Sequence, residues 1–195
     1  MSLKGFDPAR DLGLVAVFAA LIVAMSYISI SIGPVPITLQ TLAVSLCGLV
    51  LGPWRGGAAV LLYLLAGFAH LPVFAGGASG LAVLQKPAAG YLLAFPVAAV
   101  LTGVLAVQAR RIGRWLPATL TLSALLTTAL VVHPAGILGL MVNAKMSLAA
   151  AVGTDIVFWP GDVVKSVLAG LIAATVHRAF PSLLPRPVQV AQTDR

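Results

Sequence analysis

The sequence predicts an all-α integral membrane protein built as a bundle of six transmembrane helices. Hydrophobic residues make up 60% of the 195-residue chain and charged residues only 9%, whereas soluble domains carry about 25% charged residues. A helix that crosses the hydrocarbon core needs about 20 apolar residues, so a chain of this length with short turns holds about six. Clusters of glycine and proline divide the chain into segments that match this number. We therefore expect one transmembrane domain, residues 1–195, and no soluble domain.

The first three spans are bounded by turns rich in glycine and proline. The first, 12–32, is too long for the hydrophobic part of a cleaved signal peptide, and it ends at a Gly-Pro-Val-Pro turn. The second, 37–51, ends at a Gly-Pro-Trp-Arg-Gly-Gly turn. The third, 58–70, leads into a weakly charged, glycine-rich connection, residues 71–87.

The last three spans carry internal breaks. The fourth, 88–109, contains Pro96 as an expected kink and ends at a cluster of arginines. The fifth, 115–142, is expected to be interrupted in its second half by a His-Pro-Ala-Gly sequence. Residues 146–158 are too short and too broken to cross alone, so we expect an outer loop with some helix. The sixth span, 160–180, begins at a Pro-Gly-Asp sequence.

The distribution of lysine and arginine predicts the orientation, because cytoplasmic segments of membrane proteins are enriched in these residues. With the amino terminus inside, the cytoplasmic segments, which include a polar tail at 181–195, hold nine of the twelve cations. These nine are Lys4, Arg10, Arg55, Arg110, Arg111, Arg114, Arg178, Arg186 and Arg195. The outer loops hold only Lys86 and Lys145, and Lys165 lies within the sixth span. We expect a multi-pass protein of the inner (cytoplasmic) membrane, surrounded by lipid, with both termini cytoplasmic.

The same sequence argues against several classes of function. The net charge of +7 comes from scattered residues rather than from a basic run interleaved with aromatics, so no nucleic-acid partner is expected. Cys47 is the only cysteine in the sequence, which leaves no internal disulfide or cysteine metal cluster. The three histidines lack metal-ligand spacing, and there is no phosphate-binding G-x-x-x-x-G-K-[ST] sequence. We expect no metal, no cofactor and no ATP hydrolysis by this chain.

Asp162 and Lys165 are the strongest candidates for ligand binding. Ionisable groups inside a span are costly, and by default they face the bundle interior for a functional reason. Their i, i+3 spacing places both side chains on one helix face, close enough to interact. The ammonium could bind an anionic or polar group of a ligand, and the carboxylate could accept its N–H bonds. The alternative is structural, because a carboxylate at a helix start caps free N–H groups and a lysine one turn in can reach the interface.

A glycine-rich loop and Lys86 complete the candidate site. Gly76, Gly77, Ser79 and Gly80 form a segment that could let its backbone approach a ligand closely, or could only make a tight turn. Lys86 could pair with an anionic group at the mouth of a pocket, or only anchor in the lipid head groups. On the predicted topology this loop and the start of the sixth span lie on the same outer side. Together they predict a binding site open to the outside.

Two other classes of function, an intramembrane protease and a channel, fit the sequence less well. Residues 77–80, Gly-Ala-Ser-Gly, fit the G-x-S-G pattern around the serine of rhomboid-type intramembrane proteases, with His133 as the activating base. The pattern is short, and Ser79 lies in an outer loop rather than at the start of a buried helix, so no enzymatic activity is expected. A channel would need polar residues through the full depth of the bundle, and the inner halves of these spans offer almost none.

Four motifs follow one another along nearly the whole chain. They read Val-Pro-Ile-Thr-Leu-Gln-Thr-Leu-Ala at 35–43, Leu-Gly-Pro at 51–53, Leu-Pro-Val-Phe-Ala-Gly-Gly at 71–77 and Pro-Gly-Asp-Val-Val-Lys at 160–165. In this order and at these intervals they resemble the BioY family, the biotin-binding S components of energy-coupling-factor (ECF) transporters. One stretch departs from the family, which commonly has Gly-Pro-Thr-Gly-Gly-Tyr where residues 86–91 read Lys-Pro-Ala-Ala-Gly-Tyr.

The resemblance implies a six-helix S-component fold that binds biotin near the outer face. Asp162 and Lys165 match the family's Pro-Gly-Asp-x-x-Lys motif, which contributes to the biotin site. The glycine-rich loop would then cover the pocket, and Tyr91 and Trp159 would supply apolar walls. An S component for another vitamin of similar size is the nearest alternative.

The resemblance also implies partners. A transmembrane coupling subunit and two ATPase subunits of an ECF module would supply the energy that this chain cannot. Ala16, Ala20 and Ala24 form a stripe of small residues on which another helix could pack closely, either within this bundle or from outside it. The stripe resembles the surface by which S components dock on the coupling subunit.

Overall fold

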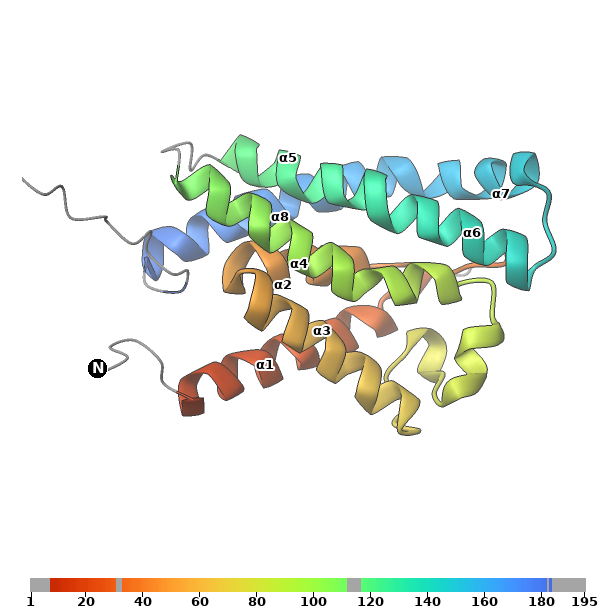
Figure 1. Ribbon diagram of the computed structural model, residues 1–195, viewed down its shortest axis with the longest axis horizontal. Helices are drawn as coiled ribbons and strands as arrows, with labels where there is room; N and C mark the ends of the chain where they lie inside the picture. The colour runs from red at the N-terminus through yellow and green to blue at the C-terminus, as the bar shows by residue number, and fades with distance from the viewer. Residues whose placement is uncertain (1–7, 31–32, 112–116, 182, 184–195) are drawn as a thin grey trace, which may run out of the picture.

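The computed structural model describes residues 8–30, 33–111, 117–181 and 183. This part of the chain forms a bundle of six helical segments joined by short connections (Figure 1). The segments are α1 (Pro8–Tyr27), α2 (Gln40–Leu51), α3 (Pro53–Phe68), α4 (Ala89–Arg111), the run of α5 (Pro117–Thr127), η3 (Thr128–Val132) and α6 (His133–Asn143), and the run of α7 (Leu148–Asp155), η4 (Ile156–Phe158) and α8 (Trp159–Ala179). The predicted all-α six-helix bundle is confirmed.

Four of the described segments are long and apolar enough to cross a membrane by themselves. They are α1, α4, the α5–α6 run and the α7–α8 run, with mean hydropathies between 1.6 and 2.1. Large apolar side chains such as Val17, Leu65 and Leu130 are exposed on the outside of the bundle. A soluble protein rarely exposes so much apolar surface, whereas lipid tails accept it. The fold is that of a multi-pass membrane protein.

The first helix ends at Tyr27, earlier than the predicted residue 32. Residues 28–32 alternate between isoleucine and serine, a pattern typical of a strand rather than a helix. Strand β1 (Ser29–Ile30) pairs antiparallel with β2 (Ile37–Thr38), with Ser29 opposite Thr38. This short ribbon carries the chain from α1 to α2.

The expected interruption of the fifth span is a change of helix type instead. The helix continues through Pro134, and the turn before it, η3, is π-helical. A proline lacks the N–H that an α-helix needs and crowds the preceding turn. The wider π-helical turn ends directly before His133, and Pro134 falls in the first turn of α6. The prediction of a broken helix was therefore wrong.

Residues 146–158 also differ from the prediction of an outer loop. The side chain of Ser147 caps α7 by accepting a hydrogen bond from the amide of Ala150 (3.3 Å). From there helix continues to Ala179, with one 3₁₀ turn at η4. Pro160 does not end it, because proline is tolerated in the first turn of α8 after that 3₁₀ turn. The sixth segment therefore begins about three turns earlier than expected.

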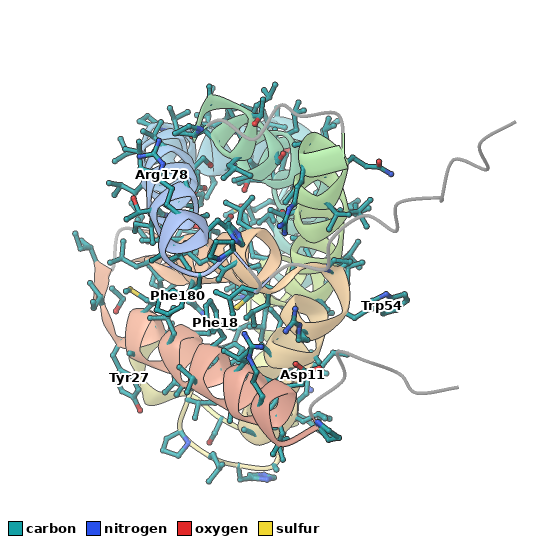
Figure 2. The ribbon with its side chains drawn as sticks, turned by 90° about the vertical axis from the view of Figure 1, so that its left-hand side faces the viewer. Asp11, Phe18, Tyr27, Trp54, Arg178 and Phe180 are labelled. Carbon is teal, nitrogen blue, oxygen red and sulfur yellow. The ribbon has the colours of Figure 1, made fainter. Side chains whose placement is uncertain are left out.

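Several arginine side chains lie at one end of the bundle. The start of α1 and the end of α8 lie at the same end (Figure 1), and Figure 2 looks onto that end, where Asp11 and Arg178 are labelled. Arg55 pairs there with Asp11 at 3.1 Å, and Arg110 donates a hydrogen bond to the carbonyl of Pro181. The α3–α4 connection and the α6–α7 turn lie at the opposite end (Figure 1).

The α3–α4 connection is tied to two helices. It contains the 3₁₀ turns η1 (Ala75–Gly77) and η2 (Leu81–Gln85). Ser26 of α1 donates a hydrogen bond to the carbonyl of Val73 (2.7 Å). Asn143, at the end of α6, donates to the carbonyls of Leu84 and Lys86 (2.8 and 2.9 Å). The connection is thereby held against the end of the bundle.

Candidate functional site

A cavity of about 360 Å³ lies between the α3–α4 connection, the segment that leads into α2, and the helices α2, α4 and α8. Its volume is within the usual range for small-molecule sites. Most of its wall is apolar and includes Val35, Phe74, Leu92, Phe95 and Phe158. It joins segments far apart in the sequence, so the predicted convergence of the α3–α4 connection with the start of α8 is confirmed.

Asp162 and Lys165 line this cavity and are both buried, at 5% and 8% exposure. The ammonium of Lys165 lies 2.8 Å from Oδ1 of Asp162, so the predicted i, i+3 interaction is confirmed. Thr41 of α2 joins the pair: its hydroxyl donates to the same carboxylate oxygen (2.8 Å) and accepts from Lys165 (3.1 Å). An ammonium has three N–H donors. Two meet Asp162 and Thr41, which leaves the third for a ligand.

A second polar group lines the cavity from the start of α2. Gln40 is buried, and its amide nitrogen donates to the hydroxyl of Tyr63 (2.7 Å). Its amide oxygen accepts from the hydroxyl of Thr38 (2.9 Å). These two bonds fix the orientation of the Gln40 side chain. A ligand that contacts it would therefore cost little additional side-chain entropy.

Behind Asp162 lies a second buried carboxylate, Asp155, which is 2% exposed and accepts three hydrogen bonds. The donors are the hydroxyl of Tyr91 (2.7 Å), Nδ1 of His133 (2.9 Å) and the indole N–H of Trp159 (3.2 Å). Nε2 of His133 lies 3.6 Å from Oδ2 of Asp162. A continuous polar network therefore runs from Tyr91 to the Asp162–Lys165 pair.

Two further residues that were predicted to contact the ligand, Lys86 and Tyr91, also line the cavity. Lys86 is exposed, whereas Lys165 is buried, so the two cations lie at different depths. The ring of Tyr91 packs against Phe158, with centroids 5.7 Å apart and planes at 70°. The cavity thus has one buried polar end and one cation near the outside.

Five predicted site residues do not line the cavity. Gly76, Gly77 and Gly80 have φ near +70°, a conformation that favours glycine, and they shape the connection from which Ala75 and Ala78 line the cavity. Ser79 is outside the lining as well. Trp159 stacks on the ring of His133 instead of forming a wall.

Four residues of the site were not predicted from the sequence: Gln40, Thr41, Asp155 and His133. Asp155 carries a signal that could have found it, because a carboxylate inside an apolar helix is a functional candidate by default. It was overlooked because 146–158 was expected to be a loop. Thr41 belongs to the motif at 35–43, but only the fold brings it within reach of Asp162.

The sequence profile of the BioY family matches residues 1–182. The chain belongs to the BioY family. The biotin transporter BioY of Rhodobacter capsulatus is 41% identical over 186 residues, covering 90% of this chain and 97% of that protein. The biotin transporter BioY of Rhizobium etli is 40% identical over 182 residues, with the same coverages. The crystal structure of the S-component for biotin from an ECF-type ABC transporter superposes with a TM-score of 0.83 at 26% identity, covering 91% of this chain and 95% of that one.

Membership of the BioY family leaves no support for the protease alternative, because these relatives are named transporters and the solved structure is a transporter component. The geometry agrees. A serine nucleophile needs a base within hydrogen-bond reach. Both ring nitrogens of His133 are directed at carboxylates, those of Asp155 and Asp162, so neither faces Ser79.

Proposed function

We propose that this BioY protein binds biotin in the cavity, as the substrate-binding subunit of an uptake system energised by partner ATPase subunits. The observation that carries the proposal is the buried group of Asp162, Lys165 and Thr41 at one end of an otherwise apolar cavity. The similarity to biotin transporters and to an S-component for biotin supports the identity of the ligand.

The charges favour one orientation of biotin. Its bicyclic head carries a neutral ureido group, with N–H donors and a carbonyl acceptor, and its flexible chain ends in a carboxylate. Asp162 can accept from the ureido N–H, while the remaining N–H of Lys165 donates to the carbonyl. A carboxylate placed there would be repelled by Asp162. We therefore place the head at the buried end and the carboxylate near Lys86.

The experiment that tests this function is calorimetry of biotin with the purified protein in detergent, beside thiamine and riboflavin. We expect tight, saturable binding of biotin and none of the other two. Binding of another vitamin in place of biotin would keep the fold and change the substrate. A folded protein that binds none of them would contradict the proposal.

Changing Lys86 to glutamine is expected to weaken biotin binding by about 1.4-fold to fivefold, because an exposed ion pair contributes about 0.2–1 kcal/mol. The difference should shrink at high salt, which screens exposed charges. Calorimetry at low and high salt measures it. Lys145→Gln, the matched change at the other outer cation, should have no effect. Biotinamide, which lacks the carboxylate, should bind both proteins equally; if it loses affinity for Lys86→Gln, the orientation is reversed.

We place the energising module against α1. Ala16, Ala20 and Ala24 are all exposed, and α1 turns Ala19, Ile22 and Ser26 toward the bundle instead. Small side chains let two helices approach closely. An ECF coupling subunit docked there would connect this chain to two ATPase subunits.

Ala20→Trp should reduce biotin uptake by cells about tenfold or more, because a large ring prevents close helix packing. Calorimetry of the purified variant should show unchanged biotin binding, since Ala20 lies outside the cavity. Leu130→Trp, at an exposed position on η3, serves as control and should leave uptake intact. Equal uptake by both variants would argue that the module docks elsewhere.

The distribution of charge supports an inner-membrane protein with both termini in the cytoplasm. A reporter that is active only in the cytoplasm, fused in turn to each terminus, tests this orientation. Activity of both fusions is expected, and activity of only one would contradict it.

A further inference from the structure

The buried network behind Asp162 holds a histidine between two carboxylates. His133 is 3% exposed, with Nδ1 at 2.9 Å from Oδ1 of Asp155 and Nε2 at 3.6 Å from Oδ2 of Asp162. Neither His133 nor Asp155 lines the cavity, whereas Asp162 does. The histidine therefore contacts the ligand site from behind, through the carboxylate of Asp162.

The surroundings of the ring favour one protonation state of this histidine, because Nδ1 lies within hydrogen-bond distance of Asp155 and Nε2 lies at ion-pair distance from Asp162. An ionised carboxylate can only accept hydrogen bonds, and a neutral imidazole carries a hydrogen on only one nitrogen. A neutral His133 would present a lone pair to either Asp155 or Asp162. A doubly protonated ring donates an N–H to Asp155 and presents its positive charge to Asp162.

Charge balance gives the same answer. The titratable groups that face His133 are Asp155 from α7 and Asp162 from α8, with Tyr91 of α4 bonded to Asp155 and Lys165 bonded to Asp162. Two carboxylates and Lys165 alone leave one uncompensated negative charge in a buried site. Such a charge is costly away from water. A positive His133 makes the described cluster neutral.

The ring is also held in one orientation. It stacks on the indole of Trp159, with centroids 4.6 Å apart and planes at 10°. The π-helical turn η3 ends directly before it, and such turns inside α-helices are frequent at functional sites. Asp155 is fixed in turn by Tyr91, which lines the cavity. The network thus links two walls of the cavity through His133.

We propose that His133 is a positioning residue of the ligand site: a doubly protonated imidazole that Asp155 holds in place and that orients the Asp162 carboxylate toward the cavity. This inference rests on the proposed function, because Asp162 is taken to bind the head of biotin. Its consequence is that biotin affinity decreases with rising pH as His133 loses its second proton.

Calorimetry of biotin binding from about pH 5 to about pH 9 tests this consequence, because histidine side chains ordinarily change charge between about pH 5 and pH 8. The wild type should bind more weakly as the pH rises. His133→Gln should bind about 2- to 100-fold more weakly at the lower pH, the usual range of coupling between residues in one network, and should show no pH dependence. His177→Gln is the matched control, because His177 is also buried but bonds the backbone carbonyl of Leu49. It should keep the wild-type affinity and slope.

A spectroscopic measurement tests the inference without ligand. The ¹⁵N chemical shifts of the ring nitrogens distinguish neutral from doubly protonated histidine, and the sequence has only three histidines to assign. We expect the ¹⁵N shifts of His133 to be those of a doubly protonated ring at neutral pH. In Asp155→Asn they should change to those of a neutral ring.

The outcomes separate the inference from the function. A neutral His133 in the wild type, or a pH slope that survives in His133→Gln, overturns the inference while biotin binding stands. Absence of biotin binding by the folded wild type overturns the proposed function, and the nitrogen shifts then decide the state of His133 alone. If His133→Gln does not fold, the wild-type spectrum remains the deciding measurement.

Discussion

Lys165→Met should weaken biotin binding by at least about a hundredfold, to below detection by calorimetry. Lys165 is the only cation among the described residues that is buried and lines the cavity, and its remaining N–H is the donor that we assign to the ureido carbonyl. Hydrogen bonds to charged groups contribute about 1.5–3 kcal/mol each. The change also removes the bonds from Lys165 to Thr41 and to Asp162, so both neighbours lose a partner that orients them toward the ligand.

The same change leaves the buried carboxylate of Asp162 without the ammonium of Lys165. The effect on folding must therefore be separated from the loss of biotin binding. Removing one member of a buried ion pair destabilises a protein by about 3–5 kcal/mol. The double variant Asp162→Asn, Lys165→Met removes both charges and should recover most of that stability. We expect it to unfold near the wild-type temperature and still bind no biotin. A double variant that binds normally would show that the pair only supports the fold.

Gly90→Ala should lower the free energy of unfolding by about 1–3 kcal/mol, the usual cost of overpacking a close contact. Gly90, at the start of α4, packs directly on the backbone of α6. A Cβ there would overlap the carbonyl oxygen of Ala135 and lie 2.9 Å from Cα of Gly139. Backbone atoms cannot turn aside as a side chain can, so α4 and α6 would have to separate. Thermal unfolding in detergent measures the loss.

Gly153→Ala is the matched control for Gly90→Ala. Gly153 also lies within a helix, α7, but a Cβ there would meet nothing within 4 Å. Alanine is the better helix former by about 1 kcal/mol, so this variant should be as stable as the wild type or more stable. Equal unfolding temperatures for Gly90→Ala and the wild type would show that the two helices can move apart freely.

The Gly90 contact also explains which part of the family pattern this chain retains. Residues 86–91 depart from the common Gly-Pro-Thr-Gly-Gly-Tyr, yet they keep the proline, the last of the three glycines and the tyrosine. The retained glycine lets α4 approach α6. The ring of Tyr91 then lies against Gly136, where a Cβ would overlap it, and its hydroxyl reaches Asp155. Gly90 thus allows the close packing of α4 on α6, and Tyr91 lines the cavity from the resulting position.

Structural features that depend on one local property of the sequence, such as hydropathy or residue spacing, were predicted most accurately. Hydropathy and length predicted a six-helix membrane bundle, because a lipid-exposed helix must be apolar over its full span. The spacing of Asp162 and Lys165 predicted their contact, since residues three apart share a helix face. Helix ends, and the path of the chain at Pro134 and Pro160, were predicted least accurately. A proline forbids one hydrogen bond, but neighbouring turns of another helix type can accommodate it.

By itself the sequence determined the class of protein, the BioY motifs and one charged pair, because all three are properties of neighbouring residues or of overall composition. Only the tertiary structure decided what surrounds that pair. Thr41, His133 and Asp155 lie on three different helical segments, and packing of α2, α6 and α7 with α8 brings them within hydrogen-bonding or ion-pairing distance of Asp162 or of one another. Contacts between residues so far apart in the chain depend on how whole helices pack, which no local pattern of residues specifies.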